Sequence, residues 1–425
     1  MIWRSKRMCK SRGDALATEP KPRPSDHISR SRSQPSTTLN SSSSSSATAA
    51  AAAATTSSSS SSSRATASSS SSSSRTSLAS VRASLPETPI IYHFREISTA
   101  TNGFLSPRLS SSSSSWRCSL RGRDVVVVQR RFLSGDPSTL PTRLSALSRA
   151  HHSAIIPLLG ASFVSPHLYL VYEYAPGASL SLLLRNPRNP SFTPLSSWSS
   201  RVQIAADVAQ GLDYIHQHSP ASLNGAAPIH NRIKSSSIIV SDSDLRARIC
   251  HFGAAALSGE IPNDSTAPNT SLIQGTRGYM APEVIAGGSI SPSSDIFAFG
   301  VVLLELLSGK EALKYNFPTE KMVVERTSVI ETARETIGAG DEDADDEERS
   351  GRVRRWMDMR LRDSFPVASA EKLIRVALRC VAEEATARPG MEWVAGKISK
   401  VLLESKEWEK RIQMPTDISV SLAPR

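Results

Sequence analysis

The sequence predicts an α+β protein with two unequal lobes, preceded by a disordered tail. A chain of 425 residues has room for one large or two ordinary domains beside such a tail. Residues 41–74 are almost all Ser, Ala and Thr, and such a segment has too little apolar surface to offset the entropy of ordering. After it, short β-branched runs come early and helical patterns come late, the order typical of an α+β fold.

The tail, residues 1–85, carries most of the net charge. It holds twelve basic and three acidic residues, so it accounts for +9 of the formal charge of +11. A charge spread over the whole chain would indicate nucleic acid or an anionic surface as partner. The tail also lacks the interleaved aromatic side chains on which single-stranded nucleic acids stack. We therefore expect no nucleic-acid partner and a solvated, phosphorylatable tail.

The cysteines and the apolar runs bear on the compartment. Cys9, Cys118, Cys250 and Cys380 lie far apart with no CxxC pair, so neither a disulfide framework nor a zinc site is predicted. The longest apolar run, residues 296–307, is shorter than the roughly 20 residues of a membrane span and reads as a buried helix. We expect a cytoplasmic protein without a transmembrane segment. Peripheral association with the plasma membrane stays open, and plastid targeting by the Arg- and Ser-rich tail is the minor alternative.

The first folded part reads as strands. Residues 125–128, 155–159 and 168–172 are short apolar or alternating runs bounded by Gly, Pro and Ser, which is the pattern of β-strands. They predict a small β-rich lobe over residues 86–174.

The later part reads as helices. In residues 201–216, apolar side chains recur at i, i+4, i+8 and i+11, so they share one face of a helix. Residues 373–381 and 394–402 show similar spacings. They predict a larger helical lobe over residues 175–405.

Two segments of this part are predicted to be irregular. Seven of the eight residues at 341–348 are acidic, and we expect a solvated insert in a loop rather than an acidic docking patch. Residues 406–425 are expected to form a C-terminal tail.

Several motifs stand in order between residues 90 and 403. They read FREISTATNGF at 94–104, LVYEY at 170–174, WSSRVQIA at 198–205, GLDYIH at 211–216, GTRGYMAPE at 275–283 and DIFAFG at 295–300. In this order they resemble the plant receptor-like protein kinases, most closely the kinase domains of LysM-type receptors. The resemblance implies the bilobal protein-kinase fold. It also implies the reaction that the site residues must be checked against. This reaction is phosphoryl transfer, which is accelerated by charges placed around the nucleotide phosphates and Mg²⁺.

The position of the family's glycine-rich loop holds serines instead. Glycine lets backbone N–H groups approach phosphates closely, and side chains at these positions remove that approach. The resemblance therefore implies that phosphate cradling is lost at six residues, Ser110, Ser111, Ser112, Ser113, Ser114 and Ser115.

The ion pair that positions the α- and β-phosphates is also replaced. Aligned on Arg121 and Gly122, the strand lysine falls on Val128, or on Gln129 with a shift of one residue. Counted back from His151 and His152, the helix glutamate falls on Arg143. Neither candidate for the lysine carries a charge. The resemblance therefore implies that both members of the pair are lost.

The catalytic loop reads HNRIKSSS at residues 230–237. Arg232 stands at the position of the base aspartate, and a guanidinium stays protonated, so it cannot accept a proton. Ser237 replaces the metal-binding asparagine, and His251 replaces the metal-binding aspartate of the Asp-Phe-Gly motif. Lys234 matches the lysine that faces the γ-phosphate, and without an aspartate beside it we expect an ordinary solvated or capping lysine.

The positions that build the family's core are retained. One set matches the hydrophobic column that joins the lobes, a second is the aspartate that anchors this column, and a third is an ion pair of the large lobe. Removing one partner of such a buried pair is strongly destabilising. The column residues are Leu147, Leu158, His230 and Phe252, the anchoring aspartate is Asp295, and the ion pair is Glu283 with Arg388.

The contrast between core and site favours a pseudokinase that uses no cofactor. Such a protein would act as an allosteric partner or scaffold, with other protein kinases or membrane receptor kinases as its partners. The alternative is an active Ser/Thr kinase that transfers phosphate from ATP with Mg²⁺ by means of substitute residues.

Overall fold

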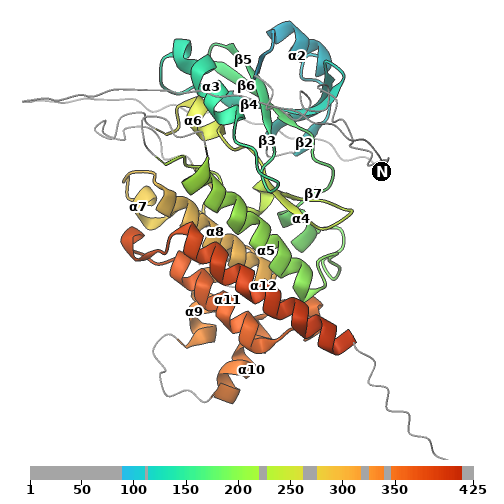
Figure 1. The fold of residues 1–425 in the computed structure, drawn as a ribbon, viewed down its shortest axis with the longest axis vertical. Helices are drawn as coiled ribbons and strands as arrows, with labels where there is room; N and C mark the ends of the chain where they lie inside the picture. Colours follow the sequence, from blue (N-terminus) through green and yellow to red (C-terminus); the bar gives the residue numbers. More distant parts are fainter. Residues whose placement is uncertain are drawn as a thin grey trace, which may run out of the picture. The chain divides into compact units, whose positions relative to one another are not determined.

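The computed structural model describes residues 89–110, 113–219, 227–261, 275–316, 325–338 and 346–413. The predicted tail, residues 1–85, lies outside the described residues. Those described belong to one compact unit, in which a sheet-rich part with α2 and α3 stands at one end and a helix-rich part at the other (Figure 1). The predicted β-rich lobe and larger helical lobe are confirmed.

The smaller lobe is built on a six-stranded sheet with the strand order β1-β5-β6-β4-β3-β2. Val125 and Val127 lie in one buried cluster and Val128 in the other, because alternate side chains of β4 point to opposite faces. The strands are β1 (Ile90–Ile91), β2 (Arg108–Ser110), β3 (Ser113–Leu120), β4 (Arg123–Arg131), β5 (Leu158–Val164) and β6 (His167–Glu173).

The strand predicted at residues 155–159 is wrong in its first part, because β5 begins at Leu158. The backbone before it pairs with the other lobe instead. Ile156 N donates to the carbonyl of Ile249 at 2.9 Å, and Ile249 N donates to that of Ala154 at 2.7 Å. These bonds fix the segment against the helical lobe.

Helices cover the two faces of this sheet. α2 (Phe94–Ala100) leads into an aromatic cluster in which the rings of Phe104 and Trp116 lie 5.1 Å apart and those of Phe94 and Tyr169 5.3 Å apart. On the other face, α3 (Leu140–Ser148) shares a buried cluster with Val128. That second face is the one toward the helical lobe.

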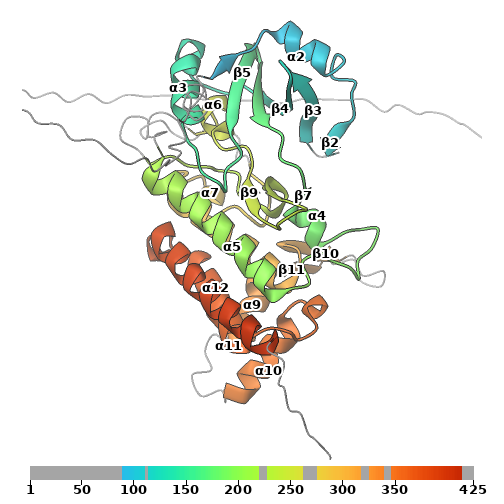
Figure 2. The same ribbon diagram turned by 45° about the vertical axis from the view of Figure 1, so that its right-hand side comes forward.

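The larger lobe is organised around a helix, α8, that is buried along almost its whole length and contains the long apolar run. α5 and α12 lie side by side in both views (Figures 1 and 2). Among the described residues, no helix is both long and apolar enough to cross a membrane. The helices are α4 (Leu180–Leu184), α5 (Trp198–Asp213), α6 (Ala254–Ser258), α7 (Pro282–Ile285), α8 (Pro292–Ser308), α9 (Val329–Ile337), α10 (Asp346–Trp356), α11 (Val367–Cys380) and α12 (Met391–Gln413).

Two small sheets complete this lobe. One contains three antiparallel strands, β7 (Ala178–Ser179), β8 (Ile238–Val240) and β9 (Ala247–Ile249), and flanks the loop at residues 230–237. The other pairs β10 (Leu313–Asn316) with β11 (Glu325–Ser328).

The predicted C-terminal tail is wrong at its start, because α12 continues to Gln413. Two hydrogen bonds hold the end of this helix to α5. Ser199 Oγ donates to Glu409 Oε2 at 2.6 Å, and Trp198 Nε1 donates to Ser405 Oγ at 2.8 Å. Of the predicted acidic insert, residues 341–345 lie outside the described part of the chain, whereas the remaining acids, from Asp346, form the first turn of α10. Acidic side chains stabilise that end of a helix.

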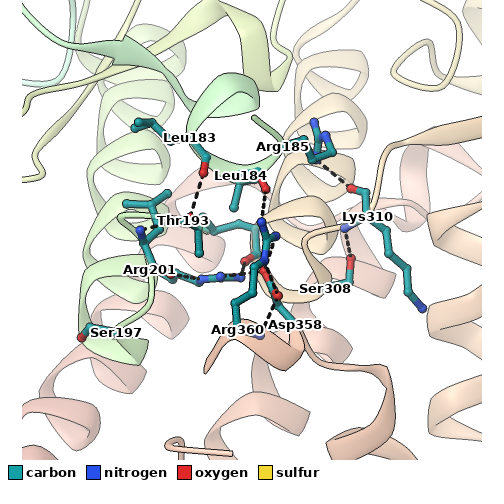
Figure 3. A network of polar contacts seen from close by, with 12 residues as sticks. Leu183, Leu184, Arg185, Thr193, Ser197, Arg201, Ser308, Lys310, Asp358 and Arg360 are labelled. Atoms are coloured by element: carbon teal, nitrogen blue, oxygen red, sulfur yellow. Dashed lines mark hydrogen bonds and ion pairs between the residues drawn. The ribbon is translucent and has the colours of Figure 1, made fainter. Parts of the chain in front are cut away.

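An ionic network ties the helices of the large lobe together, and Figure 3 shows its members converging from several elements. Arg201 of α5 is fully buried and donates to two backbone carbonyl oxygens and, at 2.7 Å, to Asp358 Oδ2. Asp358 also accepts from Arg360, whose Nη1 donates to the carbonyl of Leu184 at 2.6 Å. Burial acts to raise the pKa of Asp358, but the bonds from Arg360 and Arg201 outweigh it and hold that pKa below its usual range. We call these residues, Arg201, Asp358 and Arg360, the helical-lobe network.

Candidate functional site

The residues predicted to join the lobes are buried. The rings of His230 and Phe252 stack with their centroids 6.3 Å apart. Leu147 of α3 packs against Gly253, where an added Cβ would lie 3.2 Å from the leucine side chain. Leu158, at the start of β5, lies in the same buried cluster as Leu147 and Phe252.

Asp295, in the first turn of α8, holds the backbone of the loop at residues 230–237. Its Oδ2 accepts a hydrogen bond from His230 N at 2.7 Å, and its Oδ1 accepts one from Asn231 N at 2.8 Å. Asn231 has a φ of 60°, in the left-handed region, which few residues adopt without support. The Asp295 carboxylate provides that support.

His230 is a neutral core side chain. Its Nε2 lies 2.8 Å from the carbonyl oxygen of Cys250, and its Nδ1 accepts from Arg232 N at 3.1 Å. These two contacts place the proton on Nε2. Burial also lowers the pKa of His230.

Arg232, at the position of the family's base, is in an ion pair. Its Nε and Nη2 lie 2.8 and 2.7 Å from Oε2 of Glu260, whose side chain is only 4% exposed. Glu260 follows α6 and lies outside the loop itself. This position therefore holds a paired cation that cannot accept a proton from a substrate hydroxyl.

The hydroxyl of Ser237 makes its hydrogen bonds within its own loop. It accepts from Lys234 N at 3.0 Å and lies 2.9 Å from the carbonyl oxygens of both Arg232 and Lys234. The side chain is buried. Its bonds close the turn at residues 234–237.

His251, at the other predicted metal position, is an uncharged imidazole. Burial, and then repulsion from Arg130, lowers its pKa to about 3. Its ring meets that of Tyr172 edge to face with centroids 5.7 Å apart, and the Tyr172 hydroxyl donates to the carbonyl of Phe252 at 3.0 Å. Tyr172 of β6 is thereby fixed against the segment at residues 251–252.

These groups do not fit a magnesium nucleotide. Mg²⁺ prefers carboxylate and other oxygen ligands in a strict octahedral arrangement. The three positions here supply a guanidinium, an internally bonded hydroxyl and an imidazole, from Arg232, Ser237 and His251. Among the residues described, no group of three His, Cys, Asp or Glu side chains is placed to hold a metal ion.

The predicted positions of the lysine and glutamate lie in and beside the core. Val128 is 1% exposed in the cluster that also contains Leu144. Arg143 of α3 is buried, and its Nη2 donates to the carbonyl of Ala256 in α6, while its Nε has no hydrogen-bond partner. Arg143 therefore joins α3 to α6.

The serine run lies partly in strands. Ser110 of β2 pairs with Ser113, and Ser115 of β3 pairs with Val128. Backbone groups bonded in a sheet ladder are not available to a phosphate. Ser114 belongs to β3 as well, and the two serines between the strands, Ser111 and Ser112, lie outside the described residues.

Two residues near this site were missed by the sequence reasoning, Arg130 and Glu260. Arg130 lies two residues beyond Val128 on β4, so the two side chains share a face. Burial, and then repulsion from Arg232, lowers the pKa of Arg130, whereas Glu260 raises it. The two-residue period of a strand could have identified Arg130, but no local pattern marks Glu260.

Lys234 and the predicted ion pair complete the site. Lys234 Nζ donates to Thr276 Oγ1 at 3.2 Å, and burial followed by repulsion from Arg232 lowers its pKa. Arg388 Nη1 and Nη2 each lie 2.7 Å from a carboxylate oxygen of Glu283. This bidentate pair holds α7 to the segment before α12.

The chain is similar to known kinases. A family model described as a protein kinase domain matches residues 126–397. LysM domain receptor-like kinase 3 of Arabidopsis thaliana is 31% identical over 331 residues, covering 76% of this chain and 48% of that protein. LysM domain receptor-like kinase 10 of Oryza sativa subsp. japonica is 34% identical over 314 residues, covering 72% of this chain and 47% of that protein.

A solved structure is similar as well. The pseudokinase domain of BIR2, described as an immune regulator of the RLK/Pelle family, matches with a TM-score of 0.55 and 24% identity, covering 77% of this chain and 93% of that one. These findings confirm the kinase fold and the resemblance to receptor-like kinases. The chain spans about half the length of the curated relatives it matches.

Proposed function

The chain belongs to the protein kinase domain family, and on that premise we propose that it is a pseudokinase. Phosphotransfer is lost, and the fold serves as a non-catalytic partner or scaffold for receptor-like kinases.

The loop at residues 230–237, together with His251, carries this proposal. A kinase needs a proton acceptor and two metal ligands around the phosphates. At these positions Arg232 is paired with Glu260, the Ser237 hydroxyl is bonded within its own loop, and His251 is a neutral imidazole. A general base alone contributes about 10²–10⁴-fold to rate, and here the metal ligands are replaced with it.

The test is incorporation of phosphate from ATP by the purified full chain, with Mg²⁺ and separately with Mn²⁺. We expect none above that of heat-denatured protein, with an active receptor-like kinase as the positive control. In a thermal-shift titration, adding Mg²⁺ should not increase the stabilisation produced by ATP alone. Incorporation that disappears in Lys234→Ala, or a metal-dependent shift of several degrees, would overturn the proposal.

One observation favours the alternative, an active Ser/Thr kinase with substitute residues. Lys234 is retained at the family's γ-phosphate position, and its Nζ donates to Thr276 Oγ1 in the segment that resembles the end of the family's activation segment. The incorporation assay separates the two functions, because only the active kinase predicts a signal that depends on Lys234.

We propose that the partners are receptor-like kinases. We also propose that the protein acts in the cytoplasm, including at the surface of the membrane. The support is the similarity to proteins named as receptor-like kinases. A fluorescent fusion expressed in plant cells tests the location, and a plastid signal would overturn it. Co-precipitation with a candidate receptor-like kinase, compared with an unrelated kinase, tests the partner.

A further inference from the structure

An open groove in the helical lobe lies beside the helical-lobe network. It has a volume of about 650 Å³ and is lined by residues 190–193, Ser308, Lys310, residues 355–360 and Arg362. We call it the basic groove. No residue of the loop at 230–237 lines it. An adjoining groove of about 610 Å³ shares Pro190, Lys310 and Arg360 with it, so the surface has room for an extended segment rather than for a single side chain.

The charged side chains that line the basic groove are mostly cations. Arg360 is paired with Asp358, the one carboxylate among the lining residues. The other three cations, Lys310, Arg355 and Arg362, are exposed, and no ion pair of theirs is found in the described part of the chain. The groove therefore presents positive charge to the solvent.

The carboxylates nearest to this groove belong to its surroundings. Burial lowers the pKa of Lys310, and Glu335 of α9 raises it without forming an ion pair. Asp363 pairs with Arg354 at 2.6 Å, and Glu311 lines the adjoining groove. None of these three carboxylates lines the basic groove itself.

Large apolar side chains accompany the cations. Phe192 is 58% exposed and Met359 is 84% exposed, whereas Trp356 is nearly buried and lines the groove with one accessible edge. The Lys310 ammonium lies over the Trp356 ring, 5.5 Å from its centroid. Aromatic, Met and Arg side chains are enriched in protein interfaces, and Trp and Arg often carry much of the binding energy.

Hydrogen bonds hold both sides of the groove in place. Arg360 Nη1 lies 3.5 Å from the carbonyl oxygen of Pro190, and Thr193 Oγ1 donates to the carbonyl of Leu183 at 2.7 Å. Figure 3 shows the Lys310 side chain pointing away from Arg360. A surface that is already ordered loses less conformational entropy when a ligand binds.

We propose that the basic groove binds an acidic peptide segment of a protein partner, with an apolar side chain of that segment against Phe192 and Trp356. Charge complementarity selects the partner, because the cations attract an acidic chain and repel a basic one. The concave shape favours a peptide over a membrane, since a flat surface does not reach the recessed Trp356. The inference goes beyond the proposed function, because docking here does not depend on whether phosphate is transferred.

The experiment titrates the full chain with a short fluorescent peptide in which Asp and Glu residues flank a single Phe. One control peptide has Asn and Gln in place of the acids, and a second has Ala in place of the Phe. We expect saturable binding of the acidic peptide, weakened by salt. We expect no binding of the Asn and Gln peptide and weaker binding of the Ala peptide.

Two double variants distinguish the groove from general basicity. Arg355→Gln with Arg362→Gln should weaken binding of the acidic peptide about tenfold or more, because hydrogen bonds to charged groups are lost. Arg95→Gln with Arg131→Gln removes the same charge from two exposed residues of the small lobe and should change the affinity less than about twofold. The basic tail is identical in both variants, so it does not contribute to the difference.

A second pair of variants tests the apolar contact. Phe192→Ser should weaken binding of the Phe peptide about threefold or more, as expected for the loss of an aromatic pair, and should leave binding of the Ala peptide unchanged. The control is Leu403→Ser, which replaces a side chain of α12 that is 65% exposed and should affect neither peptide.

The contrary outcomes are specific. Absence of saturable binding, equal weakening by the two double variants, or equal binding of the Asn and Gln peptide would overturn the inference. Vesicles of phosphatidylcholine and phosphatidylserine test the membrane as occupant. If Arg355→Gln with Arg362→Gln lowers binding to these vesicles but not to the acidic peptide, the groove is a membrane site and the inference is wrong. Phosphate incorporation would overturn the proposed function and leave this inference intact.

Discussion

Arg201 of the helical-lobe network and Arg143 near the catalytic positions are both buried, and their surroundings differ. Each Nη and the Nε of Arg201 has an acceptor within 2.8 Å, and Asp358 is shared with a second arginine. The Nε atoms of Arg143 and of the half-buried Arg130 have no hydrogen-bond partner. The network satisfies its buried donors, whereas the region around α3 and β4 leaves donors unsatisfied.

The difference shows which charges the fold itself satisfies. Taking a charge out of water costs several kcal/mol, and only well-placed partners offset that cost. In the helical-lobe network the protein provides these partners, so stability accounts for the residues. Near the catalytic positions it does not provide all of them, so the cost of burying the Nε donors of Arg130 and Arg143 is not offset there.

The largest loss of stability is expected in the helical-lobe network, where the buried charges have their partners. Asp358→Ala leaves Arg201 buried without its carboxylate and should lower the free energy of unfolding by about 3–5 kcal/mol, measured by urea denaturation. The matched control is Asp124→Ala, which removes the exposed partner of Arg117 and should cost less than about 1 kcal/mol. Equal costs would contradict the structural role of the network.

Restoring the family's lysine should also be costly. Val128→Lys places an ammonium group at a side chain that is 1% exposed in an apolar cluster and should cost about 3 kcal/mol or more. Gln129→Lys, one residue along on the half-buried opposite face, is the control and should cost under about 1 kcal/mol. If the two variants are equally stable, Val128 does not belong to the core.

The two regions should lose stability at different pH values. The pKa of His251 is lowered from 6.5 to about 3 and that of His230 is also lowered, so the unfolded chain binds more protons and stability falls as the pH drops below about 6.5. The lowered pKa values of Glu283 and Asp358, from 4.5 and 3.8, act in the same direction only below about pH 5. Each group contributes at most about 1.4 kcal/mol per pH unit.

Urea denaturation between pH 7 and pH 4 measures this order. His251→Asn should flatten the dependence between about pH 6.5 and pH 5, and Glu283→Gln should leave that range unchanged. An unchanged slope in His251→Asn would show that the folded imidazole titrates normally.

The smallest effect is expected on activity. The triple variant Arg232→Asp, Ser237→Asn and His251→Asp restores the base and the metal ligands, yet it should still incorporate no phosphate. Val128 and Arg143 remain at the positions of the phosphate-orienting ion pair, and residues that act as a unit do not contribute additively. Incorporation by the triple variant would confine the loss of activity to these three positions.

Much of the fold was predictable from local sequence patterns, but the residues at which some helices and strands begin or end were not. The helices at residues 201–216 and 394–402 were marked by apolar spacing. The end of α12 depends on Ser199 meeting Glu409, a contact between residues 210 positions apart. The start of β5 likewise depends on the pairing of Ile156 with Ile249.

The sequence by itself determined the family, the order of the motifs and the identity of the side chains at the catalytic positions. Only the tertiary structure decided what those side chains meet. It paired Arg232 with Glu260, bonded Ser237 into its own loop and left Arg143 Nε without a partner. The physical reason is that periodicity and composition are local properties, whereas an ion pair or an unpartnered donor depends on where distant segments pack.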